Sequence, residues 1–269
     1  MRARHVTVLM LLLAGPAITA RQQPAASAAP PAVTAPVSAK VWIGRNEEIE
    51  NFLRTAPFKR FEDLPVGVTR PRRGFFEPGG PAASAAWKLL PPGRSNGYWE
   101  SYKSEIAAYE LDKLLGLNMV PPAVEKRWQG DRGAAILWLD GVRTWKVAES
   151  EPKPAKWNRE AVRMKMFDNL IANIDRNAGN LLIDADWNLS LIDHSRAFVT
   201  DTRLRIQMTR IDRELWDRML ALDEPTLTAA LGSWIDRGAI RAMLKRRDGM
   251  KKAIDEMLKN SSEAAIFIK

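Results

Sequence analysis

The sequence predicts an α+β fold in two lobes, a small β-rich N-lobe with one main helix and a mostly helical C-lobe. Three observations lead to this prediction. Short apolar runs bounded by Gly and Pro, which are typical of strands, gather between residues 64 and 139. A single strong helical pattern, residues 101–115, lies among them. After residue 198, apolar residues recur at helical spacing towards the C-terminus, so this part is expected to be helical.

The first 40 residues are expected to lie outside the folded domain. Arg2 and Arg4 precede a short apolar run, and small residues follow up to residue 20, which is the pattern of a secretory signal peptide over residues 1–20. The run is too short for a transmembrane helix, so no transmembrane domain is expected beyond this leader. Residues 21–40 are rich in Ala and Pro, which predicts a linker. We expect an exported protein, with anchoring by an uncleaved leader as the alternative.

The folded domain is placed at residues 41–269, with the N-lobe over about 41–139 and the C-lobe over about 140–269. The chain carries 41 Lys and Arg against 32 Asp and Glu, a net charge of +9. Most of the basic residues alternate with acidic ones along the expected helices, the pattern of a solvated face. Only the segment 245–252 contains a dense basic cluster. This distribution disfavours nucleic acid as a partner and leaves an anionic surface or an acidic substrate open.

The N-lobe is expected to begin with a short amphipathic helix over residues 46–55. Two or three strands follow, and Lys88 lies inside the last of them, in the run Ala-Ala-Trp-Lys-Leu. The glycines of this stretch, at positions 67, 74, 79 and 80, indicate turns and do not form a G-x-G-x-x-G motif. On strand evidence alone, an exposed lysine of an edge strand is the favoured interpretation of Lys88.

The main helix of the N-lobe is predicted over residues 101–115, with Gly116 as its natural C-terminal stop. Residues 134–139 form a buried apolar strand that leads into Asp140-Gly141, where a hinge between the lobes is expected. The segment 146–157 is rich in Pro and charge and is predicted to be a loop.

The most informative stretch is FDNLIANIDRNAGNLLIDADWNLSLIDHSRAF, which starts at Phe167. Apolar spacing predicts a helix up to about residue 174, with Asn158 as its N-cap. A polar loop over residues 175–180 follows, and then a hairpin of two short apolar strands that ends on Asp193. The pattern therefore brings Asp175 and the end of the loop close to Asp193.

Three side chains of this stretch suit phosphoryl transfer. Asp175 and Asn180 have the Asp-x-x-x-x-Asn spacing of a kinase catalytic loop, and Asp193 follows a hairpin, as the metal-binding Asp of a kinase does. The reaction needs a carboxylate that accepts the proton of the attacking hydroxyl and oxygen ligands for magnesium. The alternative is that these residues only satisfy their own loop backbone.

Two patches of the chain resemble a known group of proteins. DRNAGNLLI with LSLIDHSRAF is one, and EIAAYELDKLLGL with Val-Pro-Pro after it is the other. They resemble the atypical protein-kinase-like superfamily, namely the phosphatidylinositol 3-/4-kinase-like catalytic domains and the secretory-pathway kinases of the Golgi casein kinase type. The resemblance covers residues 60 to 250. It implies a two-lobed protein-kinase-like fold and ATP-dependent transfer to a hydroxyl acceptor, with a protein or lipid acceptor favoured.

The resemblance also implies roles for individual residues. Asp175 is the catalytic aspartate, and Asn180 and Asp193 are ligands of Mg²⁺ or Mn²⁺. Lys88 holds the phosphates of ATP, and Glu105 in the main helix pairs with that lysine. Glu110 competes for the pairing, and a surface Glu in a helical ion pair is the alternative for Glu105. The adenine is expected against the strand 137–139.

Other functions remain open or are disfavoured on specific residues. Ile174 stands where kinases of the classical type have His, and no glycine fingerprint is present, so an exported pseudokinase or nucleotide-binding module is the main alternative. Antibiotic phosphotransferases carry His-Gly-Asp before the loop, which Ala172 to Asp175 does not match. Cysteine and zinc hydrolases are disfavoured because the chain has no Cys and only two His, His5 and His194.

Overall fold

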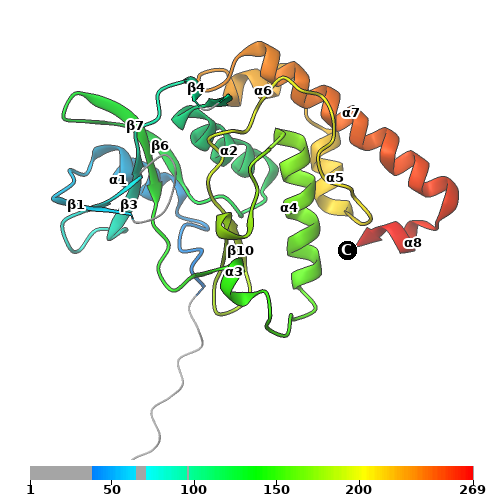
Figure 1. The fold of residues 1–269 in the computed structure, drawn as a ribbon, viewed down its shortest axis with the longest axis horizontal. Helices are drawn as coiled ribbons and strands as arrows, with labels where there is room; N and C mark the ends of the chain where they lie inside the picture. Colours follow the sequence, from blue (N-terminus) through cyan, green and yellow to red (C-terminus); the bar gives the residue numbers. More distant parts are fainter. Residues whose placement is uncertain (1–37, 65–70, 96, 269) are drawn as a thin grey trace, which may run out of the picture. The chain divides into compact units, whose positions relative to one another are not determined.

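The computed structural model describes residues 38–64, 71–95 and 97–268 (Figure 1). All of them belong to one contact unit, Pro36–Lys269. The leader predicted for residues 1–20, most of the predicted linker and Gly67 lie outside the described residues. Within these three ranges, no helix is long and apolar enough to cross a membrane.

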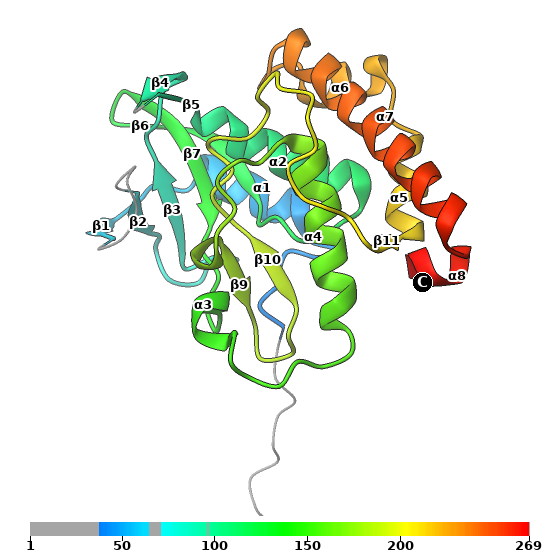
Figure 2. The same cartoon turned by 45° about the vertical axis from the view of Figure 1, so that its right-hand side comes forward.

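Five antiparallel strands form the main sheet of the N-lobe, in the order β1-β2-β3-β7-β6. The strands are Arg60–Asp63 (β1), Arg72–Phe75 (β2), Ser84–Lys88 (β3), Ala123–Trp128 (β6) and Asp131–Leu137 (β7). The sheet lies apart from the long C-lobe helices in both views (Figures 1 and 2). The predicted α+β class with a β-rich N-lobe is therefore confirmed, and Lys88 ends the central strand β3.

A cluster of aromatic and aliphatic side chains forms the core of the N-lobe. It leaves no space for a side chain at position 74, which is glycine. Phe58 stacks on Phe76 with ring centroids 4.9 Å apart. A Cβ atom on Gly74 of β2 would lie 2.5 Å from Cδ1 of Phe58, so only glycine lets the strand pass under this ring. The helix α1, Asn46–Thr55, covers the sheet as predicted and buries Ile49 and Leu53.

The helix α2, Tyr102–Leu115, stands between the two lobes. The Oγ of Ser101 caps its start by accepting from the N–H of Lys103, and Gly116 ends it in the left-handed conformation at φ +55°, as the sequence predicts. Its buried face packs on β6 and β7 and also on the C-lobe helices. Because both lobes hold this helix, a side chain on it can link the sheet to the C-lobe.

Helices dominate the C-lobe and surround a small sheet. The helices are Trp145–Ala148 (α3), Trp157–Ile171 (α4), Arg213–Leu220 (α5), Glu224–Leu231 (α6), Arg237–Asn260 (α7) and Glu263–Ile266 (α8). The strands are Arg143–Thr144 (β8), Leu181–Ile183 (β9), Leu189–Leu191 (β10), Ile211–Asp212 (β11) and Phe267–Ile268 (β12). β9 and β10 are the predicted hairpin, and β8 pairs with β9. The parallel pair β11–β12 is too short to give a sequence signal.

The start of α4 and the segment before it differ from the prediction. The helix begins at Trp157 with Lys156 in the cap position, so the prediction that Asn158 is the N-cap is wrong. The segment 146–157 is also not wholly a loop, because α3 occupies its first residues. The physical reason is a parallel stack of Trp145 on Trp157, with ring centroids 4.4 Å apart, which fixes both helix starts.

The dense basic cluster predicted at residues 245–252 does not form a single basic surface. Arg246 is fully buried and donates to the carbonyl oxygens of Leu170, Val199 and Asp201 at 2.6–2.9 Å. The guanidinium of Arg247 donates to the carbonyl of Leu222. Both guanidinium groups therefore bind backbone carbonyls of the C-lobe, and the basic residues of this segment that stay exposed are Lys245, Lys251 and Lys252.

The last residues of the predicted linker are part of the fold. Ser38 Oγ and the N–H of Ala39 donate to Oδ2 of Asp184 in the β9–β10 turn at 3.0 and 3.1 Å. A few residues later Trp42 is fully buried in the N-lobe cluster. The chain thus enters the N-lobe after contacting the C-lobe hairpin, which explains why residues 38–40 are ordered despite a linker-like composition.

Candidate functional site

The sheet, α2 and the end of the β9–β10 hairpin bring three charged side chains together. Nζ of Lys88 lies 2.6 Å from Oε1 of Glu105 and 2.7 Å from Oδ1 of Asp193. Lys88 and Glu105 are 5% and 2% exposed, whereas the Asp193 side chain is 33% exposed. The lysine therefore links the two lobes at a point where only Asp193 faces solvent.

The pKa shifts of this cluster follow from its burial and pairing. Burial is the largest influence on Lys88 and would lower its pKa, but attraction to Glu105 and Asp193 and hydrogen bonds with both outweigh it and raise the pKa of Lys88. Burial likewise favours the neutral form of Glu105, but the charge of Lys88 and a hydrogen bond from His194 hold the pKa of Glu105 well below its usual range. Both groups are therefore charged at neutral pH.

Glu105 is held at both oxygens, and Glu110 takes no part. The second oxygen, Oε2, accepts the backbone N–H of His194 at 2.9 Å. Glu110 instead contacts Lys113 on the helix surface at 3.1 Å. Of the two glutamates weighed from the sequence, the structure brings only Glu105 to Lys88.

The polar loop after α4 forms a 3-10 turn, Ala178–Asn180, that organises Asp175 and Asn180. Oδ1 of Asn177 caps this turn by accepting from the N–H of Gly179 at 2.9 Å. Nδ2 of Asn180 donates to the backbone carbonyl of Asp175 at 3.2 Å, which closes the loop. The Asp175 side chain remains 41% exposed, so it is accessible to an acceptor.

Arg176, which the sequence reasoning missed, ties the loop to the strand before Asp193. Its Nη1 donates to the carbonyls of Asn180 at 3.0 Å and of Ile192 at 2.7 Å. Nε and Nη2 bind the two carboxylate oxygens of the buried Asp168 at 2.8 and 3.0 Å. The backbones that carry Asn180 and Asp193 are thereby fixed side by side. The signal available in the sequence was Asp168, a charged residue on the apolar face of a helix.

Asp193 stands at a sharp change of chain direction. Its φ is +60°, a conformation that residues other than glycine rarely adopt and that often marks a functional position. Oδ1 accepts from Lys88 and also from Oγ of Ser195 at 3.1 Å. This backbone conformation turns the chain away from β10 directly after the carboxylate.

Arg196 contacts Asp175 and is itself paired with Glu100 of the N-lobe. Nη1 of Arg196 lies 3.3 Å from Oδ2 of Asp175, and the same guanidinium binds Glu100 at 2.6 Å. Glu100 is the last residue of β5, Tyr98–Glu100, which forms a hairpin with β4, Gly93–Ser95. No sequence pattern marked Arg196 or Glu100, because their contact depends on the fold alone.

The strand expected to lie against adenine leads into the connection between the lobes. The N–H of Trp138 donates to the carbonyl of Ser84 at 3.2 Å, which attaches the connection to β3. Arg73 of β2 lies over the Trp138 ring, 4.3 Å from its centroid, and pairs with Asp140 at 3.0 Å. These contacts hold the hinge against the sheet. The position of adenine against this strand stays a prediction.

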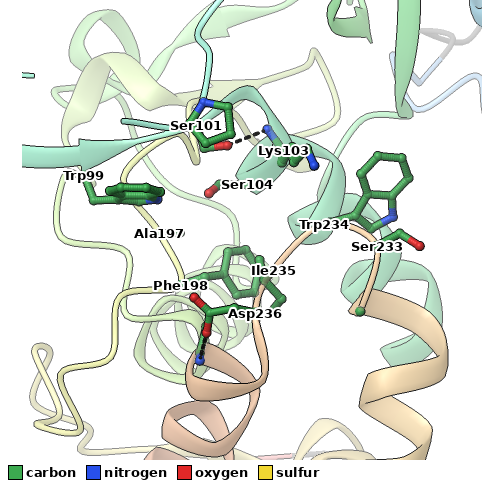
Figure 3. A pocket seen from close by; sticks show the side chains of 13 residues that line it. Trp99, Ser101, Lys103, Ser104, Ala197, Phe198, Ser233, Trp234, Ile235 and Asp236 are labelled. Atoms are coloured by element: carbon green, nitrogen blue, oxygen red, sulfur yellow. Dashed lines mark hydrogen bonds between the residues drawn. The ribbon is translucent and has the colours of Figure 1, made fainter. Parts of the chain in front are cut away.

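A pocket of about 340 Å³ lies next to this site (Figure 3). Trp99 and Trp234 line it from opposite sides, Ser101 and Lys103 contribute from the start of α2, and Phe198 forms part of its wall. Trp99 and Ser101 flank Glu100 in the chain, and Phe198 is two residues beyond Arg196. The chain on either side of the Arg196–Glu100 pair thus contributes to the lining of the pocket.

Comparisons with known proteins support the fold. No protein-family model matches the chain, and no curated protein matches it. A crystal structure of the Golgi casein kinase with Mn and ADP bound has a TM-score of 0.60 at 15% identity, over 84% of this chain and 79% of that one. The structure of hydra Fam20 with sugar has a TM-score of 0.65 at 15% identity, over 82% of this chain and 91% of that one. This chain thus has the two-lobed fold of the atypical kinase-like proteins, as its sequence predicts.

Proposed function

We propose that the protein is an ATP- and metal-dependent phosphotransferase that acts on a hydroxyl acceptor. The observation that carries the proposal is the Lys88–Glu105–Asp193 cluster beside the Asp175–Asn180 loop. A kinase needs these parts in one place: a lysine on a central strand, a glutamate on the following helix, a metal-binding aspartate and a catalytic loop. The likeness to a kinase whose structure contains Mn and ADP supports the same reading.

Lys88 is proposed to hold the phosphates of ATP. An ammonium group has three N–H donors, of which Glu105 and Asp193 take two. The third is left for a phosphate oxygen. Because Glu105 is itself held by His194, the ammonium cannot swing away from this position without leaving a buried carboxylate unpaired.

Asn180 and Asp193 fit a divalent metal by the chemistry of their donor atoms. Asn180 uses its Nδ2 for the carbonyl of Asp175 and so leaves Oδ1 for a cation, and Asp193 is partly exposed. The part of the chain that the structure describes contains no group of three or more His, Cys, Asp or Glu that is placed to hold a metal ion. A site with few protein ligands suits Mg²⁺ or Mn²⁺ that is bound together with phosphates. An ion held by Asn180 and Asp193 would neutralise negative charge on the phosphates of ATP.

Asp175 is proposed as the catalytic aspartate. Its carboxylate accepts the proton of the acceptor hydroxyl while the new bond forms between that oxygen and the γ-phosphorus, and the bond from phosphorus to the ADP oxygen breaks. The acceptor is proposed to be a protein or lipid hydroxyl, on the basis of the resemblance. Export of the protein likewise remains a proposal that rests on residues 1–20.

The experiment that tests this function is ATP turnover by the full-length protein with Mg²⁺ or Mn²⁺. Asp175→Asn is expected to lower the rate roughly 10²–10⁴-fold, the usual contribution of a positioned base. Asp217→Asn, an exposed aspartate on α5, is the matched control and should have no effect. Equal rates for the Asp175 variant and the control would contradict the catalytic role. ATP binding without turnover would instead favour the pseudokinase alternative.

A further inference from the structure

We propose that Arg196 is a positioning residue for Asp175, and that Glu100 holds Arg196 in place for this task. This inference rests on the proposed phosphotransferase function and adds two residues to its machinery. The contact that points to it is the pair of Nη1 of Arg196 and Oδ2 of Asp175, 3.3 Å apart.

Three side chains contact the guanidinium of Arg196, namely Glu100, Asp175 and Tyr98. Nε and Nη2 both lie 2.6 Å from Oε1 of Glu100. Nη1 is directed to Asp175, and the Tyr98 ring lies 4.5 Å below the guanidinium carbon. A planar guanidinium that is held at Nε and Nη2 keeps Nη1 in one place. That place is next to the Asp175 carboxylate.

The two carboxylates do not share Arg196 equally. The side chain of Glu100 is 3% exposed, so its charge needs a permanent partner, whereas that of Asp175 is 41% exposed and its contact is longer. Arg196 is therefore anchored by Glu100 and pairs with Asp175 through Nη1. An acceptor or a phosphate can approach Asp175 without displacing the anchor.

The backbone around Arg196 is fixed as firmly as its side chain. The carbonyl of Ser195 accepts the N–H of Ser101 at 3.0 Å, next to Glu100. The N–H of Phe198 donates to the carbonyl of Ile171 at the end of α4, which precedes the catalytic loop. The segment that carries the arginine is thus tied both to the end of the strand that carries its anchor and to the helix that precedes the loop of Asp175.

The consequence for the reaction is geometric. With Oδ2 of Asp175 paired to Arg196, the carboxylate cannot rotate freely, and Oδ1 is left for the acceptor hydroxyl. Positioning of a catalytic group within a few tenths of an ångström is worth orders of magnitude in rate. Because Arg196 acts through Asp175, its removal should reduce the rate of transfer more than the affinity for ATP.

The test compares Arg196→Gln and Arg196→Lys in the full-length protein, by steady-state kinetics and by crystal structures of both variants. Arg196→Gln is expected to lower kcat at least tenfold with a less than threefold change in KM for ATP. Arg196→Lys, which keeps the charge, should recover part of kcat. In the crystals, the Asp175 carboxylate should leave its present orientation in the Gln variant and keep it in the Lys variant. Arg203→Gln, at an exposed pair with Asp201 further along the segment, is the control.

The outcomes separate this inference from the proposed function. An unaltered kcat together with an unmoved Asp175 carboxylate in a folded Arg196→Gln protein would overturn the positioning role. If the unsubstituted protein turns over no ATP, the proposed function fails, while the orientation of the carboxylate in the two variants still decides whether Arg196 positions Asp175.

Discussion

Lys88 and Glu105 form a buried ion pair of 2.6 Å between the central strand of the N-lobe and the helix that joins the lobes. Each residue has a second partner in the C-lobe, Asp193 for the lysine and the backbone of His194 for the glutamate. The geometry of the pair therefore depends on the relative position of the two lobes as well as on the local fold. Its loss should affect both stability and nucleotide binding.

Glu105→Gln is expected to destabilise the protein by about 3 kcal/mol at pH 7, because it leaves the buried ammonium with one carboxylate fewer. Denaturant unfolding measures this change. Glu110→Gln, whose carboxylate only meets Lys113 at the surface, is the matched control and should cost less than about 0.5 kcal/mol. Equal costs for the two variants would contradict the account of the pair.

The stability that Glu105 contributes should depend on pH in a defined direction. Its pKa is lowered on folding from the ordinary value of 4.5. A carboxyl whose pKa is depressed by folding stabilises the folded state at pH values above its pKa in the unfolded chain. This contribution is lost as the pH falls towards the pKa of the folded state. The difference in unfolding free energy between the natural protein and Glu105→Gln should therefore be constant above about pH 5 and shrink in more acidic solution.

Asp112 should show the opposite dependence. Burial raises the pKa of Asp112 to about 6 from 3.8, although the backbone N–H groups of Met119 and Val120 donate to it. When folding raises the pKa of a carboxyl, its contribution to stability is fully present at pH values below its pKa in the unfolded chain. The contribution is lost as the pH rises through its pKa in the folded protein. Relative to Asp112→Asn, the natural protein should lose about 2 kcal/mol between pH 4 and pH 7. Parallel curves of unfolding free energy against pH would show that this carboxyl does not titrate as described.

Arg246→Met is expected to destabilise the protein by ~3 kcal/mol or more, because three backbone carbonyls lose their donor inside the C-lobe. Lys245→Met, at the exposed neighbouring position, should change stability by less than about 0.5 kcal/mol. Thermal or denaturant unfolding of the two variants decides between a structural role and a role in binding an anionic partner. A stable Arg246→Met protein would be inconsistent with the structural role.

Arg176→Ala should impair metal-dependent nucleotide binding although Arg176 need not touch the ligand. Its guanidinium fixes the backbones that carry Asn180 and Asp193, so the two proposed metal ligands should lose their relative position. We expect at least a tenfold weaker affinity for Mg-ATP, measured by calorimetric titration. Arg210→Ala, at an exposed arginine outside these contacts, provides the comparison. Unchanged affinity in a folded Arg176→Ala protein would show that the two ligands are positioned by other contacts.

The sequence predicts those parts of the fold that carry a local signal. The helix 102–115 has a cap at Ser101 and a stop at Gly116, and the hairpin before Asp193 has two apolar runs around a turn. The prediction that Asn158 is the N-cap is wrong because the stack of Trp145 on Trp157 decides where the helix begins. This contact joins residues 12 positions apart and leaves no local signal. Strand β6 was not predicted from the sequence because charged residues interrupt its apolar positions.

The same distinction applies to the site. Asp175, Asn180 and Asp193 follow a spacing that can be read from the chain, and Lys88 and Glu105 follow from a resemblance. Arg196 and Glu100 are 96 positions apart and meet only in the folded protein. Likewise, the sequence places Arg246 in a dense basic cluster. Its burial and its three carbonyl partners arise only in the folded protein and cannot be predicted from the local sequence.

The measurement that tests the central claim most directly is the binding of ATP to the full-length protein with and without Mg²⁺, beside Asp193→Ala and the control Asp217→Asn. The account predicts binding that requires the metal, that is lost in Asp193→Ala and that is retained in the control. Binding of equal strength in Asp193→Ala, or no binding by the folded natural protein, would contradict the proposal that Lys88, Asn180 and Asp193 form a metal–nucleotide site.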